Sequence, residues 1–359
     1  MDLVSLLTLA AGVLLVAGAL FDALRTTVGV GGGGPITNRL AHGLWHVALR
    51  WHRRKQQQGN AGEDAGEGRH RLLTRVGPAA LIGVVSTWVL LLVAGYFLMF
   101  SADPSSVVSA STGAPVEGEK RLYFAGFTVS TLGMGDVVPK GPAARVLTAA
   151  ASLSGFFVMT LTVTYAIPVV SAVVAKRRLA ASIAGLGQTP AEILRGGWDG
   201  ESLASLEQPL VNVAAEIEMH TQRHLAYPVL HVFHTDEERT AIGPRVAALS
   251  EALRLIGHLP EASRPPPASV RAARSAIDGF LGTLHASFVP AREQLHAPER
   301  PVAEPLRAAG LLASDEEAGE EKETDGEQER RRHFLRALVE DGGWTWADVT
   351  GAQGNRPIA

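Results

Sequence analysis

Cysteine is absent from the 359 residues of this chain. Its absence excludes disulfide bonds, metal sites built from thiolates and a cysteine nucleophile, although it does not fix the compartment. The N-terminus also lacks the basic residues and the cleavage site of a secretory signal peptide, so we expect the first apolar segment to be retained. No motif indicates hydrolase, kinase or redox chemistry, and we expect neither enzymatic activity, nor a resident cofactor, nor a nucleic-acid partner.

Charge is absent from three long apolar segments, residues 3–21, 76–100 and 146–175. A helix needs roughly 20 apolar residues to cross the hydrocarbon core of a bilayer, so each segment is long enough to span a membrane. Helices of this length in soluble proteins usually carry a polar stripe, which these segments lack. The sequence therefore predicts an all-α protein that crosses the cell membrane three times, with an N-terminal transmembrane helix over residues 1–25.

Basic residues are missing between positions 101 and 119, but they are abundant near other ends of the spans. Residues 25–75 carry nine arginines and lysines against three acidic residues, and Lys176, Arg177 and Arg178 follow the third span. Basic residues collect on the cytoplasmic side of membrane proteins. We therefore expect an external N-terminus, a cytoplasmic segment 26–75, an external segment between the second and third spans, and a cytoplasmic C-terminal half.

Segment 26–75 contains an amphipathic pattern. Leu40, Leu44, Val47 and Trp51 recur at helical spacing on one face. We interpret this face as the apolar side of a helix at the membrane interface, with Trp45 and Trp51 as anchors. Packing of a soluble helix on the cytosolic domain is the alternative.

The stretch TVSTLGMGDVVP, residues 128–139, interrupts the membrane-like sequence with two glycines and an aspartate. The preceding residues 121–130 form an apolar run too short to cross a bilayer, which suits a re-entrant helix. Irregular backbone at membrane depth is tolerated only where it is buried in protein or lines a water-filled path. We therefore predict that residues 131–135 line a pore.

The order of these features resembles the potassium-channel pore domain. That family carries an outer helix, a pore helix, a filter of the type TVGYGD, a proline soon after it, and an inner helix with a glycine. Here the corresponding features are residues 76–100, 121–130, the TLGMGD stretch at 131–136, Pro139, and residues 144–175 with Gly155. The resemblance covers about residues 76–175 of the pore domain that we place at 76–178.

The resemblance implies a homotetramer in the lipid bilayer, in which rings of backbone carbonyls replace the hydration shell of a permeant K⁺. It implies oxygen ligands from Thr131, through its carbonyl and hydroxyl, and from Leu132, Gly133 and Met134. Gly133 and Gly135 let the carbonyls point the same way. Asp136 is expected at the outer mouth, where its carboxylate concentrates cations and bonds to the pore helix.

Met134 departs from the family, which usually has tyrosine at this position. A thioether cannot donate the hydrogen bond by which the tyrosine hydroxyl holds the filter. The sequence thus predicts a potassium-selective channel, with two alternatives. One is a weakly selective cation channel. The other is a membrane-anchored scaffold or sensor with a vestigial pore.

Two residues of the inner helix are gating candidates. Pro168 removes a helix hydrogen bond and is expected to kink the helix. Gly155 suits either a hinge or close packing between helices, and the sequence favours neither. A voltage sensor is not expected, because no span carries arginines at every third position.

The C-terminal half changes to a soluble, helical pattern, which we divide into a helical cytosolic domain at 179–313, an acidic disordered linker at 314–331, and a short helix with a tail at 332–359. No glycine-rich nucleotide-binding motif follows a strand there, so a regulatory ligand cannot be named. Glu216, His220 and His224 share one helical face. They suggest a divalent-metal or proton sensor, the alternative being helix surface and packing between subunits.

Overall fold

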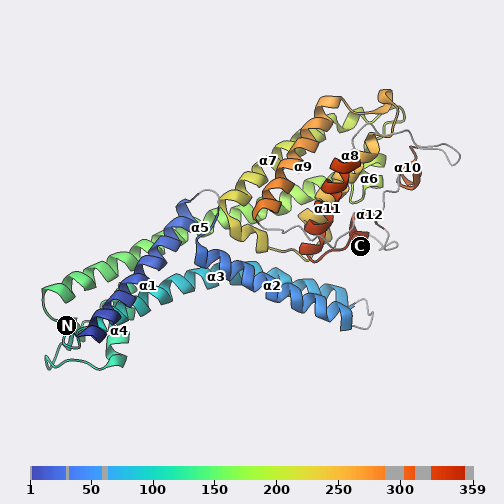
Figure 1. Ribbon diagram of the computed structural model, residues 1–359. Coiled ribbons are helices and arrows are strands. Elements are labelled where there is room, and N and C mark those ends of the chain that lie inside the picture. Colours follow the sequence, from blue (N-terminus) through green and yellow to red (C-terminus); the bar gives the residue numbers. More distant parts are fainter. Residues whose placement is uncertain (1, 30–31, 59–63, 288–302, 312–324, 352–359) are drawn as a thin grey trace. The chain divides into compact units, whose positions relative to one another are not determined.

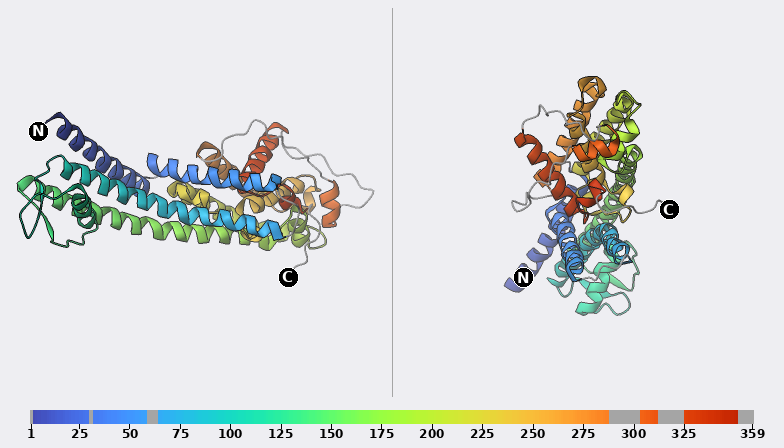
Figure 2. Two further views of the ribbon diagram at one scale, coloured as in Figure 1. Left: turned by 90° about the horizontal axis from the view of Figure 1, so that it is seen from below. Right: turned by 90° about the vertical axis from the view of Figure 1, so that its right-hand side faces the viewer.

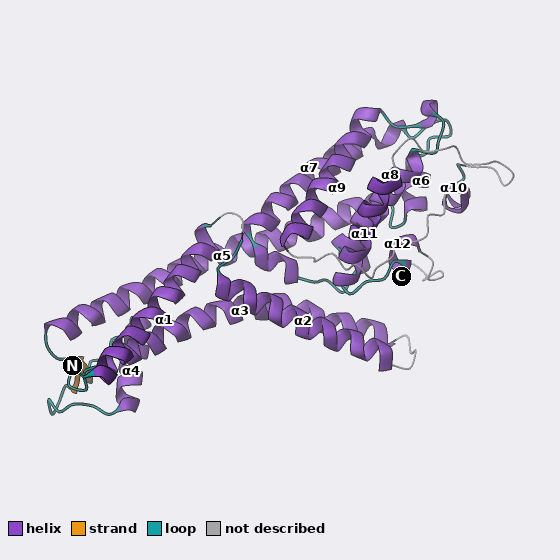
Figure 3. Cartoon of the chain, viewed as in Figure 1, coloured by secondary structure: helices purple, strands orange, loops and turns teal. Residues whose placement is uncertain are grey.

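A computed structural model of the chain describes residues 2–29, 32–58, 64–287, 303–311 and 325–351 (Figure 1). Helices dominate these residues, and strands are confined to one short two-stranded sheet (Figure 3). The chain divides into two compact units. The membrane unit comprises Met1–Leu44, Pro78–Val170 and Tyr227–Val229, and the C-terminal unit comprises Trp45–Gly77, Ser171–Ala226 and Leu230–Ala359.

Among the described residues, three helices are long and apolar enough to cross a membrane: α1 (Leu3–Val28), α3 (Asp64–Ser101, with its candidate span from Leu73) and α5 (Pro142–Leu186). Figure 2 shows them as long continuous ribbons. Two of them extend past the predicted spans, since α3 begins before residue 76 and α5 continues beyond residue 175. The prediction of an all-α membrane protein with three spans, one of which is an additional N-terminal helix, is confirmed.

Small residues bring α1 and α3 together. A side-chain carbon added at Gly12 would lie 2.6 Å from the carbonyl oxygen of Gly95, and one added at Gly95 would lie 2.8 Å from that of Gly12. Such contacts leave no room for even a methyl group. Close approach at small residues is a common way for membrane helices to associate, because lipid offers no hydrophobic driving force for their contact.

A buried polar network lies at the other end of α1, where α2 (Pro35–Gln58) begins. The Asp22 carboxylate accepts hydrogen bonds from the backbone N–H of Ile36 (2.7 Å) and from the hydroxyl of Thr37 (2.7 Å). It also accepts one from the indole N–H of Trp88 on α3 (2.8 Å). Because the first turn of a helix has unpaired N–H groups, Asp22 acts as a cap for α2 from a different helix.

The structure confirms one part of the prediction for α2 and contradicts another. Leu44, Val47 and Trp51 are exposed, as a face toward lipid headgroups requires. Trp45, however, is buried, and its ring contacts His231 and His234 with centroids 6.4 and 6.3 Å away. The prediction that Trp45 is an interfacial anchor is therefore wrong, because its side of the helix packs against protein.

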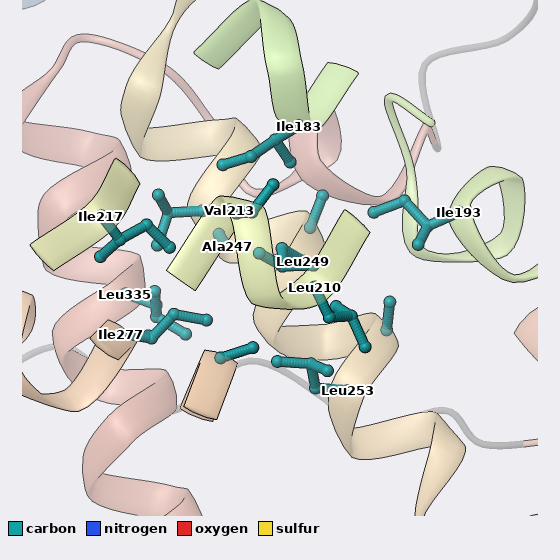
Figure 4. Packing of buried hydrophobic residues seen from close by; sticks show 14 of the residues in the cluster. Ile183, Ile193, Leu210, Val213, Ile217, Ala247, Leu249, Leu253, Ile277 and Leu335 are labelled. Carbon is teal, nitrogen blue, oxygen red and sulfur yellow. The ribbon is translucent and has the colours of Figure 1, made fainter. Parts of the chain in front are cut away.

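The C-terminal unit is a helical assembly around one apolar core. Its elements are α6 (Pro190–Gly197), η1 (Ala204–Leu206), α7 (Glu207–Ala226), η2 (Pro228–Val232), η3 (Glu238–Thr240), α8 (Ile242–Ile256), η4 (Glu261–Ser263), α9 (Pro267–Ser287), α10 (Ala303–Ala309), α11 (Asp325–Asp341) and α12 (Ala347–Thr350). Figure 4 shows side chains such as Ile217, Leu249 and Ile277 meeting in this core. The last turns of α5 contribute Leu179 and Ile183 to it.

The C-terminal helix belongs to this core. We expected a short helix from residue 332 after an acidic disordered linker at 314–331, whereas α11 begins at Asp325. Residues 314–324 of that linker lie outside the described residues. Leu335 and Val339 of α11 are buried in the core. The assignment of residues 325–331 to a disordered linker is corrected, because the turns that follow them are anchored by apolar contacts.

Candidate functional site

The predicted pore helix is α4 (Gly118–Val129). Aromatic contacts hold its second half in place, because the ring of Phe124 packs edge-on against Phe100 and Phe127, with centroids 4.9 and 5.2 Å away. Phe124 is buried, and Phe100 belongs to α3. The sequence therefore forms a short helix whose C-terminal end is fixed against the outer helix. The negative end of its dipole lies beside the loop that follows.

The loop 131–136 leaves the helix through two backbone hydrogen bonds. The N–H of Thr131 donates to the carbonyl of Thr128 (3.0 Å), and the N–H of Leu132 donates to the carbonyl of Phe127 (2.9 Å). Both bonds satisfy carbonyls of the last helical turn. The loop is thus tied to the pore helix at its start.

The backbone of this loop alternates in handedness. Thr131, Gly133 and Gly135 have φ values of 61°, 59° and 81°, whereas Leu132 and Met134 have no positive φ. Glycine adopts this conformation easily, but a β-branched residue such as threonine does so at a cost of about 1–3 kcal/mol. Thr131 is the only described non-glycine residue with positive φ. Alternation between positive and negative φ turns successive carbonyls toward the same side of the chain.

The side chains of the loop are open to the surroundings of the single chain. Leu132 is 67% exposed and Met134 is 56% exposed, although both are apolar. Exposed apolar side chains of this kind are typical of a surface that contacts other molecules or lipid.

A small antiparallel sheet, whose two strands flank α4 in the sequence, supports the end of the loop. β1 (Val107–Ser109) pairs in antiparallel fashion with β2 (Val137–Pro139), and the N–H of Ala110 donates to the carbonyl of Asp136 (2.9 Å). The Asp136 side chain is exposed, and in the described part of the chain its carboxylate makes no hydrogen bond with α4. The expected bond from Asp136 to the pore helix is therefore not formed within one chain.

Gly155 lies against the pore helix. A side-chain carbon added to it would overlap the carbonyl oxygen of Val129, at the last residue of α4. This contact is the close packing that the sequence left as one of two options. Gly155 thus places α5 against the C-terminal end of α4, from which loop 131–136 starts. Pro168, the second gating candidate, lies inside α5, which continues on both sides of it.

The histidines of α7 face the core. His220 and His224 are buried, their rings lie 5.2 Å apart, and Phe280 packs against both. Burial, with the nearby Lys176 and Arg223 charges, lowers the pKa of His220 to about 3. Burial also holds the pKa of His224 well below its usual value. Both rings are therefore neutral at physiological pH.

Glu216 points elsewhere, toward Arg178, with 3.6 Å between Oε1 and the guanidinium. Across the described ranges, no three His, Asp or Glu side chains come close enough to hold a metal ion. Glu216, His220 and His224 thus share a helical face without forming a ligand set. The depressed pKa of His220 also gives no support to proton sensing near neutrality.

Sequence reasoning missed two features of the membrane unit. The small sheet has only three residues per strand, too few for a periodic signal. The Asp22 network joins residues far apart in the sequence. Its one local signal was an acidic residue near the end of an apolar span, which is a reason to look for a partner.

Comparison with known proteins defines the class of the membrane unit. Residues 83–172 match the family model described as "Ion channel", so this part of the chain is an ion-channel pore module. The match covers α4, loop 131–136 and most of the α3 and α5 spans. The resemblance inferred from the TLGMGD stretch is confirmed at the level of the family.

A second comparison extends over nearly the whole chain. This chain is 30% identical over 347 residues to the uncharacterized membrane protein YdjJ of Bacillus subtilis (strain 168), and the match covers 96% of each protein. The chain belongs to the same family of membrane proteins as YdjJ. No solved structure matches the chain.

Proposed function

We propose that the protein is a potassium-selective channel in which four identical chains surround one ion pathway. The observation that carries this proposal is the alternating backbone of loop 131–136, with positive φ at Thr131, Gly133 and Gly135. Four such loops provide stacked rings of carbonyl oxygens that replace the water around K⁺. The threonine conformation is unfavourable by itself, which supports a function that needs it.

The exposed apolar side chains support the assembly. Leu132 and Met134 of loop 131–136, and Phe156 on α5, are exposed in one chain. Contact with neighbouring chains or lipid removes these surfaces from water. We place loop 131–136 at the outer face of the cell membrane, with the N-terminus outside and the C-terminal unit in the cytoplasm, because of the distribution of basic residues.

The decisive experiment is a planar-bilayer recording of the purified protein under opposed K⁺ and Na⁺ gradients. We expect the current to reverse at the K⁺ equilibrium potential. A reversal near zero would favour a weakly selective cation channel, which Met134 leaves open. Silent protein that is folded and tetrameric would contradict conduction and favour a scaffold or sensor.

A pair of variants ties the current to the loop. Gly133→Ala should abolish selective current, because an alanine disfavours the positive φ that the carbonyl geometry needs. Gly118→Ala is the matched control, since it lies at the start of α4 in open space without positive φ. Unchanged reversal potential in Gly133→Ala would show that ions do not pass through this loop.

Orientation has its own test. A reporter inserted after Gly59 should report the cytoplasm, and one inserted near Gly113 should report the outside. The opposite pair of readings would overturn the placement of the loop at the outer face, without bearing on ion selectivity.

A further inference from the structure

We propose that the C-terminal unit binds a small organic anion in a groove between the end of α8 and the start of α9. The groove has a volume of about 440 Å³, within the range of roughly 300–1,000 Å³ that small-molecule sites occupy. The loop that joins the two helices forms one wall, and the first turns of α9 form another. The proposed ion conduction through loop 131–136 does not involve this groove.

The charge of the groove is strongly positive. Arg264, Arg271 and Arg274 line it, and Glu261 is the one carboxylate among its described lining residues. A guanidinium presents planar pairs of N–H groups that match the two oxygens of a carboxylate or a phosphate. Three such groups in one concave site favour an anionic ligand over a neutral or cationic one.

Two of the arginines are held in position by the backbone. Arg264 donates to the carbonyls of Leu259 (2.6 Å) and Gly257 (2.8 Å), and Arg274 donates to the carbonyl of Leu253 (2.8 Å). These bonds satisfy carbonyls at and beyond the end of α8, so both arginines have a structural role as caps of that helix end. They also fix the side chains in advance, so that a ligand does not have to order them.

Arg271 is not explained by such capping. Its side chain is exposed, and it makes no hydrogen bond or ion pair with the residues that the structure describes. Arg271 and Arg274 are three residues apart on α9, so their like charges lie on the same face of the helix and repel each other. An anion in the groove would relieve this repulsion.

The remaining walls indicate the rest of the ligand. Ile256, Val270 and the consecutive prolines 265–267 supply rigid apolar surface beside the arginines. An inorganic ion would leave this surface in contact with water, whereas a molecule with an apolar or ring portion would cover it. The chemical class is therefore a small organic molecule with a phosphate or carboxylate group, whose hydrogen-bond donor could pair with Glu261.

Isothermal titration calorimetry of the full chain in detergent tests this site. The probes are ADP, citrate and inorganic phosphate at constant ionic strength. We expect ADP or citrate to bind with about one site per chain. Tighter binding of ADP would indicate a preference for phosphate groups, and tighter binding of citrate a preference for carboxylates. Inorganic phosphate should bind more weakly than the preferred organic anion. No binding of either organic anion, or equally tight binding of inorganic phosphate, would overturn the proposal.

Arg271→Gln should weaken the binding about tenfold or more, because it removes a charge-assisted contact. Arg239→Gln, an exposed arginine on η3 of the same unit, is the matched control and should bind as the wild type does. Equal affinity in wild type and Arg271→Gln would contradict the site. Because the assay measures binding and not current, its outcome is independent of whether the pore conducts.

Discussion

Trp88 donates its indole N–H to Asp22 over 2.8 Å, across 66 residues of sequence, and both side chains are fully buried. The contact ties the additional N-terminal helix α1 to the outer helix α3 of the ion-channel module. Because Asp22 also caps the start of α2, one carboxylate joins three helices.

Removal of this carboxylate should destabilise the membrane unit strongly. Asp22→Ala leaves several buried donors without an acceptor, each at a cost of about 1–3 kcal/mol, whereas Trp88→Phe removes a single donor. We expect a larger fall in melting temperature for the first variant than for the second, measured in detergent. In a double-mutant cycle the two losses should be less than additive, and additivity within about 0.5 kcal/mol would show that the residues do not interact.

Gly155→Ala should lower the stability of the membrane unit, because the added methyl group meets the carbonyl of Val129. Overpacking of this kind costs about 1–3 kcal/mol. Gly185→Ala is the control in the same helix, where an added carbon meets nothing within 4 Å. Thermal unfolding compares the two. A stable Gly155→Ala protein with altered open probability would restore the hinge interpretation.

Pro168→Ala addresses gating separately. The variant regains an N–H within α5 and so adds one helix hydrogen bond, which straightens and stiffens the helix at this point. We expect single-channel recordings to show a changed open probability with unchanged conductance, since the filter loop is untouched. An unaltered open probability would remove Pro168 from the gating mechanism.

Glu251 should be essential for the stability of the C-terminal unit. This buried carboxylate of α8 accepts from Arg254 (3.1 Å) and from Arg332 of α11 (2.6 Å). Glu251→Gln breaks both pairs and leaves buried charge, which costs about 3–5 kcal/mol. Asp278→Asn is the control, because its pair with Arg331 is more exposed and contributes at most about 1 kcal/mol. Equal urea midpoints for the two variants would exclude Glu251 as an anchor of α11.

The buried histidines predict sensitivity to acid. Folding lowers the pKa of His220 from an ordinary value of 6.5 to about 3, chiefly through burial. The unfolded chain therefore takes up a proton as the pH falls through 6.5, while the folded chain does not do so until about pH 3. Stability should be full above pH 6.5 and fall below it, by at most about 1.4 kcal/mol per pH unit for this group.

His220→Phe, which keeps an aromatic ring against Phe280, should flatten this dependence between pH 6.5 and 4. Denaturant unfolding at several pH values measures it. His224 contributes in the same direction, because burial lowers its pKa also. An unchanged slope in His220→Phe would show that His220 is not buried as a neutral ring.

The local pattern of the sequence was sufficient for the three spans and for the pore module. A span is recognised by uninterrupted apolar length, and a re-entrant loop by glycines at alternate positions, so both signals lie within a few neighbouring residues. The positive φ of Gly133 and Gly135 follows the same logic. That Thr131 shares this conformation could not be read from its residue type, because threonine usually avoids it.

Tertiary structure alone decided the roles of charged and aromatic residues with distant partners. From the sequence, Trp45 was predicted to be an interfacial anchor and residues 325–331 to belong to an acidic linker, and Asp22 had no predicted partner. Each is defined by contacts with segments far away along the chain: Trp88 for Asp22, His231 for Trp45, and Asp278 for Arg331 of α11. The physical reason is that burying a polar group is unfavourable unless a partner satisfies it, and only the folded chain brings that partner within hydrogen-bond distance.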